Sequence, residues 1–360
     1  MKYSVVWSWV AAFVVLALLP LLPEPIGTPF HIELGAKVAI MAIFALSLQL
    51  LVGYTGLVSL GHAAFFGFAA YMVALLAPQS DVGNGWLLLG AAVGASMLLA
   101  LAIGALVMRT KGIYFIMVTL AFAQLVYFVV HDTRYFGGSD GTYIYFKPEF
   151  TLLGWRFVDL EQPAQFYWFT LALLAFTVGA LALVLRSRLG HTFVGIKHNE
   201  QRMRAAGYAT VAYKLASFVI GGAFAGLAGF LYATQHGYVN PELLSWHKSG
   251  DALLMVILGG LGSLAGAVVG AASFVLLAEW FQDLTKHWQL LMGGFIIGLV
   301  VLLPQGIAGG FTRLRQRGMP RARSQAQSPG GKPAAAPQHT DPEADEALPV
   351  PRPGAASSHR

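Results

Sequence analysis

The side chains with the clearest capacity for chemistry lie in a glycine-rich stretch that begins at residue 53. Ser59 and His62 are three positions apart, so on a helix they share one face. A histidine inside a membrane is costly and often functional, whereas glycines weaken a helix by up to about 1 kcal/mol each. The stretch is therefore a candidate translocation path or helix break, although the residues alone slightly favour a His62 that only hydrogen-bonds a neighbouring carbonyl. The candidates are Gly53, Tyr54, Gly56, Ser59, Gly61 and His62.

A second glycine-rich stretch interrupts the apolar segment 251–278. A broken helix at membrane depth is tolerated where protein surrounds it, and such breaks often mark transport paths. At about 1.5 Å per residue, this segment is long enough for two short helices that enter and return, or for two thin spans. Its candidate residues are Gly259, Gly260, Gly262 and Ser263.

The segment 186–214 is too polar to span a membrane and too long for a simple turn. Its lysines and arginines face a single carboxylate, Glu200, as expected for a cytoplasmic loop. We expect residues 197–206 to form one helix that ends at Gly207 as its C-cap. The residues alone favour a solvated loop over the sharper alternative, a coupling helix seated in a groove of an ATPase.

The sequence carries no enzyme or cofactor motif. It has no Walker A sequence, no His-x-x-x-His spacing and no cysteine. Few carboxylates are available to couple transport to protons, and Glu242, Asp251, Glu279 and Asp283 lie at or near the ends of apolar segments. These observations weigh against an enzyme and against a secondary carrier.

The composition is that of a membrane protein. Of the 360 residues, 56% are hydrophobic and 11% charged, with a mean hydropathy of +0.63, whereas soluble domains carry about 25% charge. Only helices suit such long apolar runs, because isolated strands leave backbone groups unpaired in lipid. The apolar segments are 5–22, 36–52, 55–77, 86–108, 113–131, 166–185, 213–235, 251–278 and 288–304.

The charges of the loops set the expected topology. Basic loops belong in the cytoplasm, and the arginines after residue 312 place the C-terminus there too. Nine crossings would place the two termini on opposite sides of the membrane, so with both termini inside one segment must not cross. We expect this segment to be 251–278. The fold class is therefore all-α, a polytopic inner-membrane helical bundle of about 8–10 transmembrane helices with one interrupted or re-entrant segment.

The two ends of the chain differ in character. Residues 5–22 lack a small-residue cleavage site, so we expect a retained first span and not a signal peptide. Residues 1–312 form the expected transmembrane domain, and we expect the Pro- and Ala-rich residues 313–360 to form a disordered cytoplasmic tail. Small residues four apart favour close helix packing, at Gly222/Gly226, Gly262/Gly266, Gly266/Gly270 and Gly294/Gly298.

Six motifs in order resemble those of the branched-chain amino acid ABC transporter permeases, over about residues 30–312. The outer loop Gly-Gly-Ser-Asp-Gly at 137–141 resembles that of one member of the family's permease pair. The other motifs lie at 53–67, 111–124, 187–215, 225–229 with 258–263, and 304–309.

The resemblance implies a bacterial inner-membrane importer subunit without a cofactor of its own, because partner subunits hydrolyse ATP. The implied partners are a second related permease, two cytoplasmic ABC ATPases, a periplasmic binding protein and the lipid bilayer, with no nucleic acid. It also makes the coupling helix the better interpretation of 186–214. The implied solute is a branched-chain amino acid, with urea or a short-chain amide as the alternative. The coupling residues are then Ile196, Glu200, Arg204, Ala205, Ala206 and Gly207.

Overall fold

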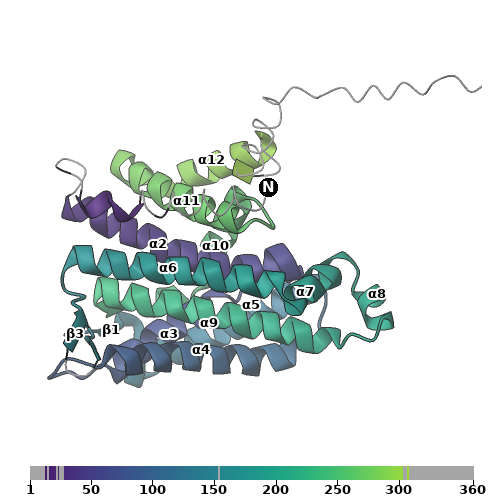
Figure 1. Cartoon of the computed structure of the whole chain (residues 1–360), viewed down its shortest axis with the longest axis horizontal. Coiled ribbons are helices and arrows are strands. Elements are labelled where there is room, and N and C mark those ends of the chain that lie inside the picture. The colour runs from purple at the N-terminus through teal and green to yellow at the C-terminus, as the bar shows by residue number, and fades with distance from the viewer. Residues whose placement is uncertain are drawn as a thin grey trace, which may run out of the picture. The chain divides into compact units, whose positions relative to one another are not determined.

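The computed structural model describes residues 13, 16–21, 23, 28–152, 155–302 and 306–307. Most of the expected first span, 5–22, and the whole expected tail, 313–360, lie outside these residues. Within the described part, the chain is an all-α membrane bundle (Figure 1). Six of its helices, α2 being counted together with the helical turn that extends it, are long and apolar enough to cross a bilayer.

The helices fall into three groups by length. The long ones are α2 (Pro29–Gln49), α4 (Gly85–Val107), α5 (Ile113–Asp132), α6 (Pro163–Arg186), α9 (Thr210–His236) and α11 (Leu264–Leu284). The shorter ones are α3 (Ala63–Leu76), α10 (Trp246–Gly259), α12 (Trp288–Leu302), α7 (Arg188–His198) and α8 (Glu200–Ala205). Single helical turns are η1 (Leu19–Leu21), η2 (Leu50–Thr55), η3 (Arg134–Phe136), η4 (Gly138–Asp140) and η5 (Pro241–Leu244).

Two small antiparallel ribbons lie at the end of the bundle opposite α7 and α8 (Figure 1). One pairs β1 (Thr142–Tyr143) with β4 (Tyr238–Val239), and the other pairs β2 (Phe150–Leu152) with β3 (Trp155–Val158). We call this the ribbon end and the other the α7 end. The two ends correspond to the loops that the sequence predicts to be outer and cytoplasmic.

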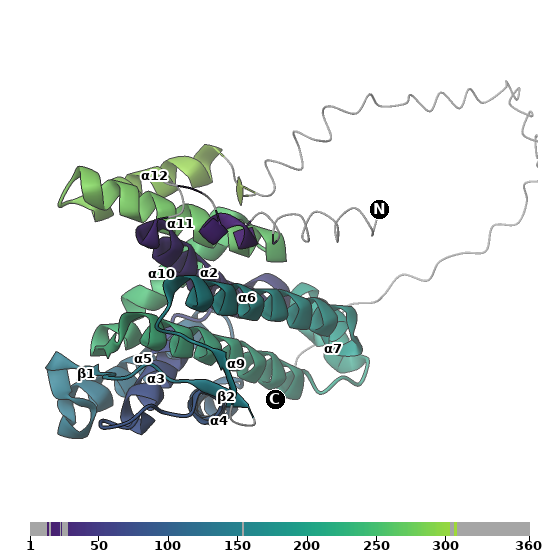
Figure 2. The ribbon, with the colours of Figure 1, turned by 60° about the vertical axis from the view of Figure 1, so that its left-hand side comes forward.

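The centre of the bundle is α2. In its most apolar window 89% of the residues are buried, against 28% for α5, so α2 is enclosed by protein while α5 presents most of its surface outward. Helices α6, α9 and α11 pack against α2, and α12 packs on α11 (Figures 1 and 2).

Close packing of α9 on α4 depends on the absence of side chains. A Cβ added to Gly222 would lie 2.6 Å from the Cβ of Ala100, and one added to Gly226 would lie 2.6 Å from the Cβ of Ser96. This is the close helix approach that small residues permit in lipid. The expected packing role of this glycine pair is confirmed.

The interrupted segment forms a helical hairpin with wider bounds than 251–278. A Cβ on Gly270 would collide with the Met255 carbonyl, and one on Gly259 with the Gly266 carbonyl. Helix α11 therefore runs back along α10. With 14 residues, α10 is about 21 Å long, too short to cross alone. Gly306 contacts the backbone of Gly260, so α12 brings the chain back to the turn of this hairpin.

The expectation of one helix over 55–77 is wrong. Residues 56–62 are not helical, and α3 begins only at Ala63. Gly56 has φ +78°, a left-handed conformation that glycine adopts without a steric penalty and that ends the preceding helix. Gly61 then passes so close to the Thr119 carbonyl of α5 that a Cβ would overlap it.

Candidate functional site

The first helix break lies at the α7 end of α2. The helix widens into a π-helical turn, η2, and stops at Gly56. The backbone N–H of Leu57 reaches back to the Leu51 carbonyl at 2.9 Å, and the Thr55 hydroxyl donates to the Leu50 carbonyl at 3.1 Å. A π-helical turn of this kind is rare and is often found at functional sites.

The second break separates α10 from α11. Gly260 and Gly262 have φ +105° and +85°, where other residues are strained. The Ser263 hydroxyl accepts a hydrogen bond from the N–H of Gly266 at 3.1 Å and so caps the start of α11. The glycines therefore allow the chain to reverse direction, and the serine caps the helix that follows.

The two breaks are more than 200 residues apart in the sequence, but they face each other in the structure. The Gln49 amide donates to the carbonyl of Gly260 at 3.2 Å and to that of Ser263 at 3.1 Å. A Cβ on Gly53 would lie 3.0 Å from the backbone nitrogen of Gly262. Gln49 is not among the residues predicted from the sequence, although an amide in the apolar run 36–52 is a signal in itself.

A large apolar groove opens beside the facing breaks. Its volume is about 1010 Å³, and Tyr54, Gly262 and Ser263 line it together with one face of α6. Three of the predicted path residues thus share one groove. Its α6 side is built mostly of small and aliphatic residues, including Ala172, Ala175, Gly179 and Ala182.

Ser59, Gly61 and His62 of the first stretch lie in the packed interior. His62 is fully buried, and its Nε2 lies 2.7 Å from the Ser47 hydroxyl. Because that hydroxyl donates to the Phe44 carbonyl, it accepts from His62. Ser59, also fully buried, accepts from the N–H of Gly61 at 3.2 Å. The bond that His62 makes is to a hydroxyl and not to a carbonyl.

The segment between α6 and α9 forms two helices, so the expectation of one helix over 197–206 is wrong. Asn199 is extended, with φ −160°, and its side chain accepts from the N–H of Arg202 at 2.9 Å. Asparagine favours this N-cap role over a helix interior. It therefore ends α7 and starts α8 at the same position.

The expected C-cap at Gly207 is present. Its φ is +87°, its N–H bonds the Arg204 carbonyl at 3.0 Å, and the N–H of Tyr208 bonds the Met203 carbonyl at 3.1 Å. This pair of bonds is a Schellman motif, which satisfies the last carbonyls of a helix. The corner after α8 is therefore a defined turn.

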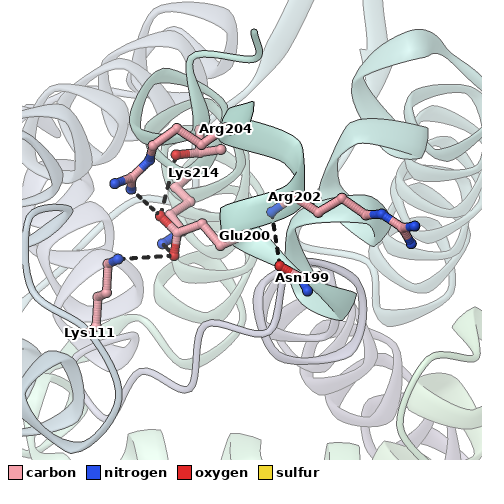
Figure 3. Close-up of polar contacts among 7 residues, drawn as sticks. Lys111, Asn199, Glu200, Arg202, Arg204 and Lys214 are labelled. Carbon is pink, nitrogen blue, oxygen red and sulfur yellow. Dashed lines mark hydrogen bonds and ion pairs between the residues drawn. The ribbon is translucent and has the colours of Figure 1, made fainter. Parts of the chain in front are cut away.

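Glu200 is the centre of a cluster of charges at the start of α8 (Figure 3). Its carboxylate lies 2.6 Å from Lys214, 2.9 Å from Arg204 and 3.9 Å from Lys111. It also accepts from the Thr210 hydroxyl at 3.3 Å. These partners belong to α8, to α9 and to the turn before α5, so one side chain joins three parts of the chain.

The cluster changes the acidity of Glu200. Burial raises the pKa of its carboxyl, but the hydrogen bond and charge of Lys214, with Lys111 and Thr210, outweigh burial and lower the pKa below its usual 4.5. The Lys214 side chain is only 7% exposed. Its ammonium group therefore depends on Glu200 for a counter-charge.

Glu200→Gln should lower the thermal stability of the permease at neutral pH by about 3–6 °C, since a charged hydrogen bond contributes about 1.5–3 kcal/mol. A lowered folded-state pKa gives stability that is complete above the unfolded pKa and is lost as pH falls through the folded value. The difference from wild type should thus shrink below about pH 4.5. Thermal unfolding in detergent from pH 3 to 7 measures it, with the exposed Asp283→Asn as control. A difference independent of pH would contradict this assignment.

The predicted coupling residues divide by exposure. Ala205, Ala206 and Gly207 are exposed at the corner after α8, and Arg204 is half exposed beside Glu200. Ile196 is buried and lines a cavity of about 220 Å³ at the α7 end. It holds α7 in the bundle and offers no surface to a partner. Tyr208 and Val211, 42% and 45% exposed, extend the apolar corner.

Among the described residues, no group of three or more His, Asp or Glu side chains is placed to hold a metal ion.

Comparison with known proteins covers most of the described bundle. Residues 32–303 match the family described as the permease component of branched-chain amino acid transport systems. The high-affinity branched-chain amino acid permease protein LivM of Salmonella typhimurium is 29% identical over 81% of this chain and 74% of its own. LivM of Escherichia coli K12 is 28% identical over the same shares.

A more distant relative has a different solute in its name. The autoinducer 2 import permease protein LsrC of Escherichia coli O9:H4 is 30% identical over 46% of this chain and 50% of its own. No solved structure matches the chain significantly. The region that the family match covers includes both breaks and the whole α7–α8 segment.

Proposed function

Because the chain belongs to the permease component family of branched-chain amino acid transport systems and is a membrane subunit of an ABC importer, not an enzyme, we propose that its solutes are leucine, isoleucine and valine. A periplasmic binding protein delivers them, and a second related permease completes the membrane path. Two ATPases bind the α7 end from the cytoplasm and supply the energy. The N- and C-termini lie on that side.

One observation carries the coupling part of this proposal. Helix α8 and its glycine corner are exposed at one end of the bundle, while Glu200 ties them to α9 and to the turn before α5. A rigid, exposed element with attachments to several membrane helices can pass a partner's motion into the bundle. The apolar residues of the corner suit burial in a protein groove.

The path part of the proposal rests on the two breaks. The Gln49 amide joins the two breaks by donating to the carbonyls of Gly260 and Ser263, and Tyr54, Gly262 and Ser263 line the groove between α6 and the start of α11. Backbone groups at a helix break can bind the charged ends of a zwitterion, and an apolar groove suits its aliphatic side chain. The buried Ser59 and His62 support these helices from within.

ATP should be required for uptake. In proteoliposomes containing this permease, its partner permease and both ATPases, with the binding protein outside and ATP inside, labelled leucine should accumulate. Excess isoleucine or valine should compete, and urea or acetamide should not. A proton gradient without ATP should drive no uptake. Proton-driven uptake would replace the importer by a secondary carrier, and competition by urea or acetamide alone would replace the amino acid by an amide.

A further inference from the structure

The α7 segment has a direct bond to the first helix break. The Lys197 ammonium donates to the Gly53 carbonyl at 2.6 Å, across 144 positions of sequence. The last carbonyls of a helix have no partner within it, so this bond satisfies a group that the break leaves open. A cation at a helix C-terminus also complements the helix dipole.

The contact involves the stem of the lysine as well as its charge. A Cβ on Gly56 would lie 3.1 Å from Cγ and 3.5 Å from Cα of Lys197, so the side chain lies directly against the glycine that ends η2. Both glycines of the first break, Gly53 and Gly56, therefore touch one residue of α7.

The contact continues into the second break. Gly53 also lies against the backbone of Gly262, and Gln49, one turn earlier, donates to the carbonyls of Gly260 and Ser263. A displacement of Lys197 thus acts on a carbonyl next to both breaks. Lys197 and Gly53 thus connect α7 to the hairpin of α10 and α11.

The surroundings of Lys197 allow it to change position. It lines the cavity of about 220 Å³ that Glu200 and Lys214 also line, and it is exposed on its other side. A long, flexible lysine next to open space can release its carbonyl without repacking the core. In contrast, Ile196 beside it is buried and holds α7 in place.

We propose that Lys197 is a positioning residue that links the coupling segment to the paired helix breaks, so that movement of α7 alters the break at Gly53 and, through it, the break at Gly260–Ser263. The inference rests on the proposed importer function and adds the residue that transmits the motion. It predicts that loss of the lysine uncouples ATP hydrolysis from transport, since the ATPases still dock on α8.

The test compares leucine uptake with ATP hydrolysis in the complete transporter in proteoliposomes. Lys197→Met keeps most of the stem but removes the charge and the donor. It should lower the leucine transported per ATP hydrolysed at least fivefold while ATP hydrolysis stays within twofold of wild type. Lys197→Arg, which restores a cationic donor, should recover at least half of the lost ratio. Lys286→Met, an equal change at an exposed lysine after α11, should have no effect.

Each outcome decides the proposal. An unchanged ratio in Lys197→Met overturns it, as does a parallel fall in uptake and hydrolysis, which would show that Lys197 only helps the ATPases dock. Failure of Lys197→Arg to recover the ratio overturns the role of the donated bond. Wild-type transporter without ATP-dependent uptake would instead refute the proposed function, so the two failures are separate.

Discussion

Replacing Ala206 with arginine is expected to abolish ATP-driven uptake while the permease still folds. Ala206 is exposed at the C-terminal end of α8, next to the Schellman turn at Gly207. Exposed substitutions change stability by about 0.5 kcal/mol or less. In a docked complex, however, the same arginine would be buried against a surface that accommodates alanine. A loss of about 2–3 kcal/mol in docking free energy corresponds to about 30- to 150-fold in affinity.

The experiment measures three quantities on the same variant. Thermal unfolding of the permease alone should match wild type, co-purification of the ATPases should fall, and uptake should fall with it. The matched control is Ser80→Arg, also exposed but in the loop between α3 and α4 at the ribbon end, and it should retain ATPase binding. Wild-type ATPase binding and uptake in Ala206→Arg would remove α8 from the coupling site.

Replacing Gly270 with valine is expected to prevent the α10–α11 hairpin from closing. Its Cβ would collide with the Met255 carbonyl and lie 2.6 Å from the backbone nitrogen of Gly259. Backbone atoms cannot rotate away as a side chain can, so the helices must separate. Overpacking of this kind costs about 1–3 kcal/mol or more, which corresponds to a fall of about 5–10 °C in the unfolding temperature.

Gly298→Val provides the comparison for this stability test. Gly298 lies in α12 and an added Cβ there would meet nothing within 4 Å, so the purified permease should unfold at the wild-type temperature. Both variants are measured in detergent without partner subunits, which keeps contacts with a second permease out of the result. Equal unfolding temperatures for Gly270→Val and wild type would show that α10 and α11 are not in close contact.

The contrast between these glycines shows how far a small-residue pattern can be interpreted. The pairs Gly222/Gly226 and Gly266/Gly270 pack against neighbouring helices, whereas a Cβ added to Gly294 or Gly298 would meet no neighbouring atom within 4 Å in the described part of the chain. The sequence spacing is the same in each case. Only the position of the neighbouring helix distinguishes a packing glycine from an open one.

Apolar runs and glycines predicted the helices well where the helix depends only on residues close in sequence. Apolar runs of bilayer length form helices, the glycines at 259–262 separate α10 from α11, and Gly207 ends α8. Two boundaries were wrong for local reasons of their own. The helix expected over 55–77 begins only at Ala63, after the left-handed Gly56, and Asn199 divided one expected helix into two, because hydropathy does not register backbone φ or capping bonds.

The sequence by itself determined that this is a polytopic membrane protein with two glycine-rich breaks and a polar segment at 186–214, because the length of an apolar run and the conformational freedom of glycine are properties of single segments. Only the tertiary structure decided which of these features touch. Gln49 reaches a carbonyl 211 positions away, and Lys197 reaches one 144 positions away. Such contacts depend on how whole helices pack, and no local pattern of residues specifies them. The candidate path and its connection to the coupling segment therefore became visible only in the folded chain.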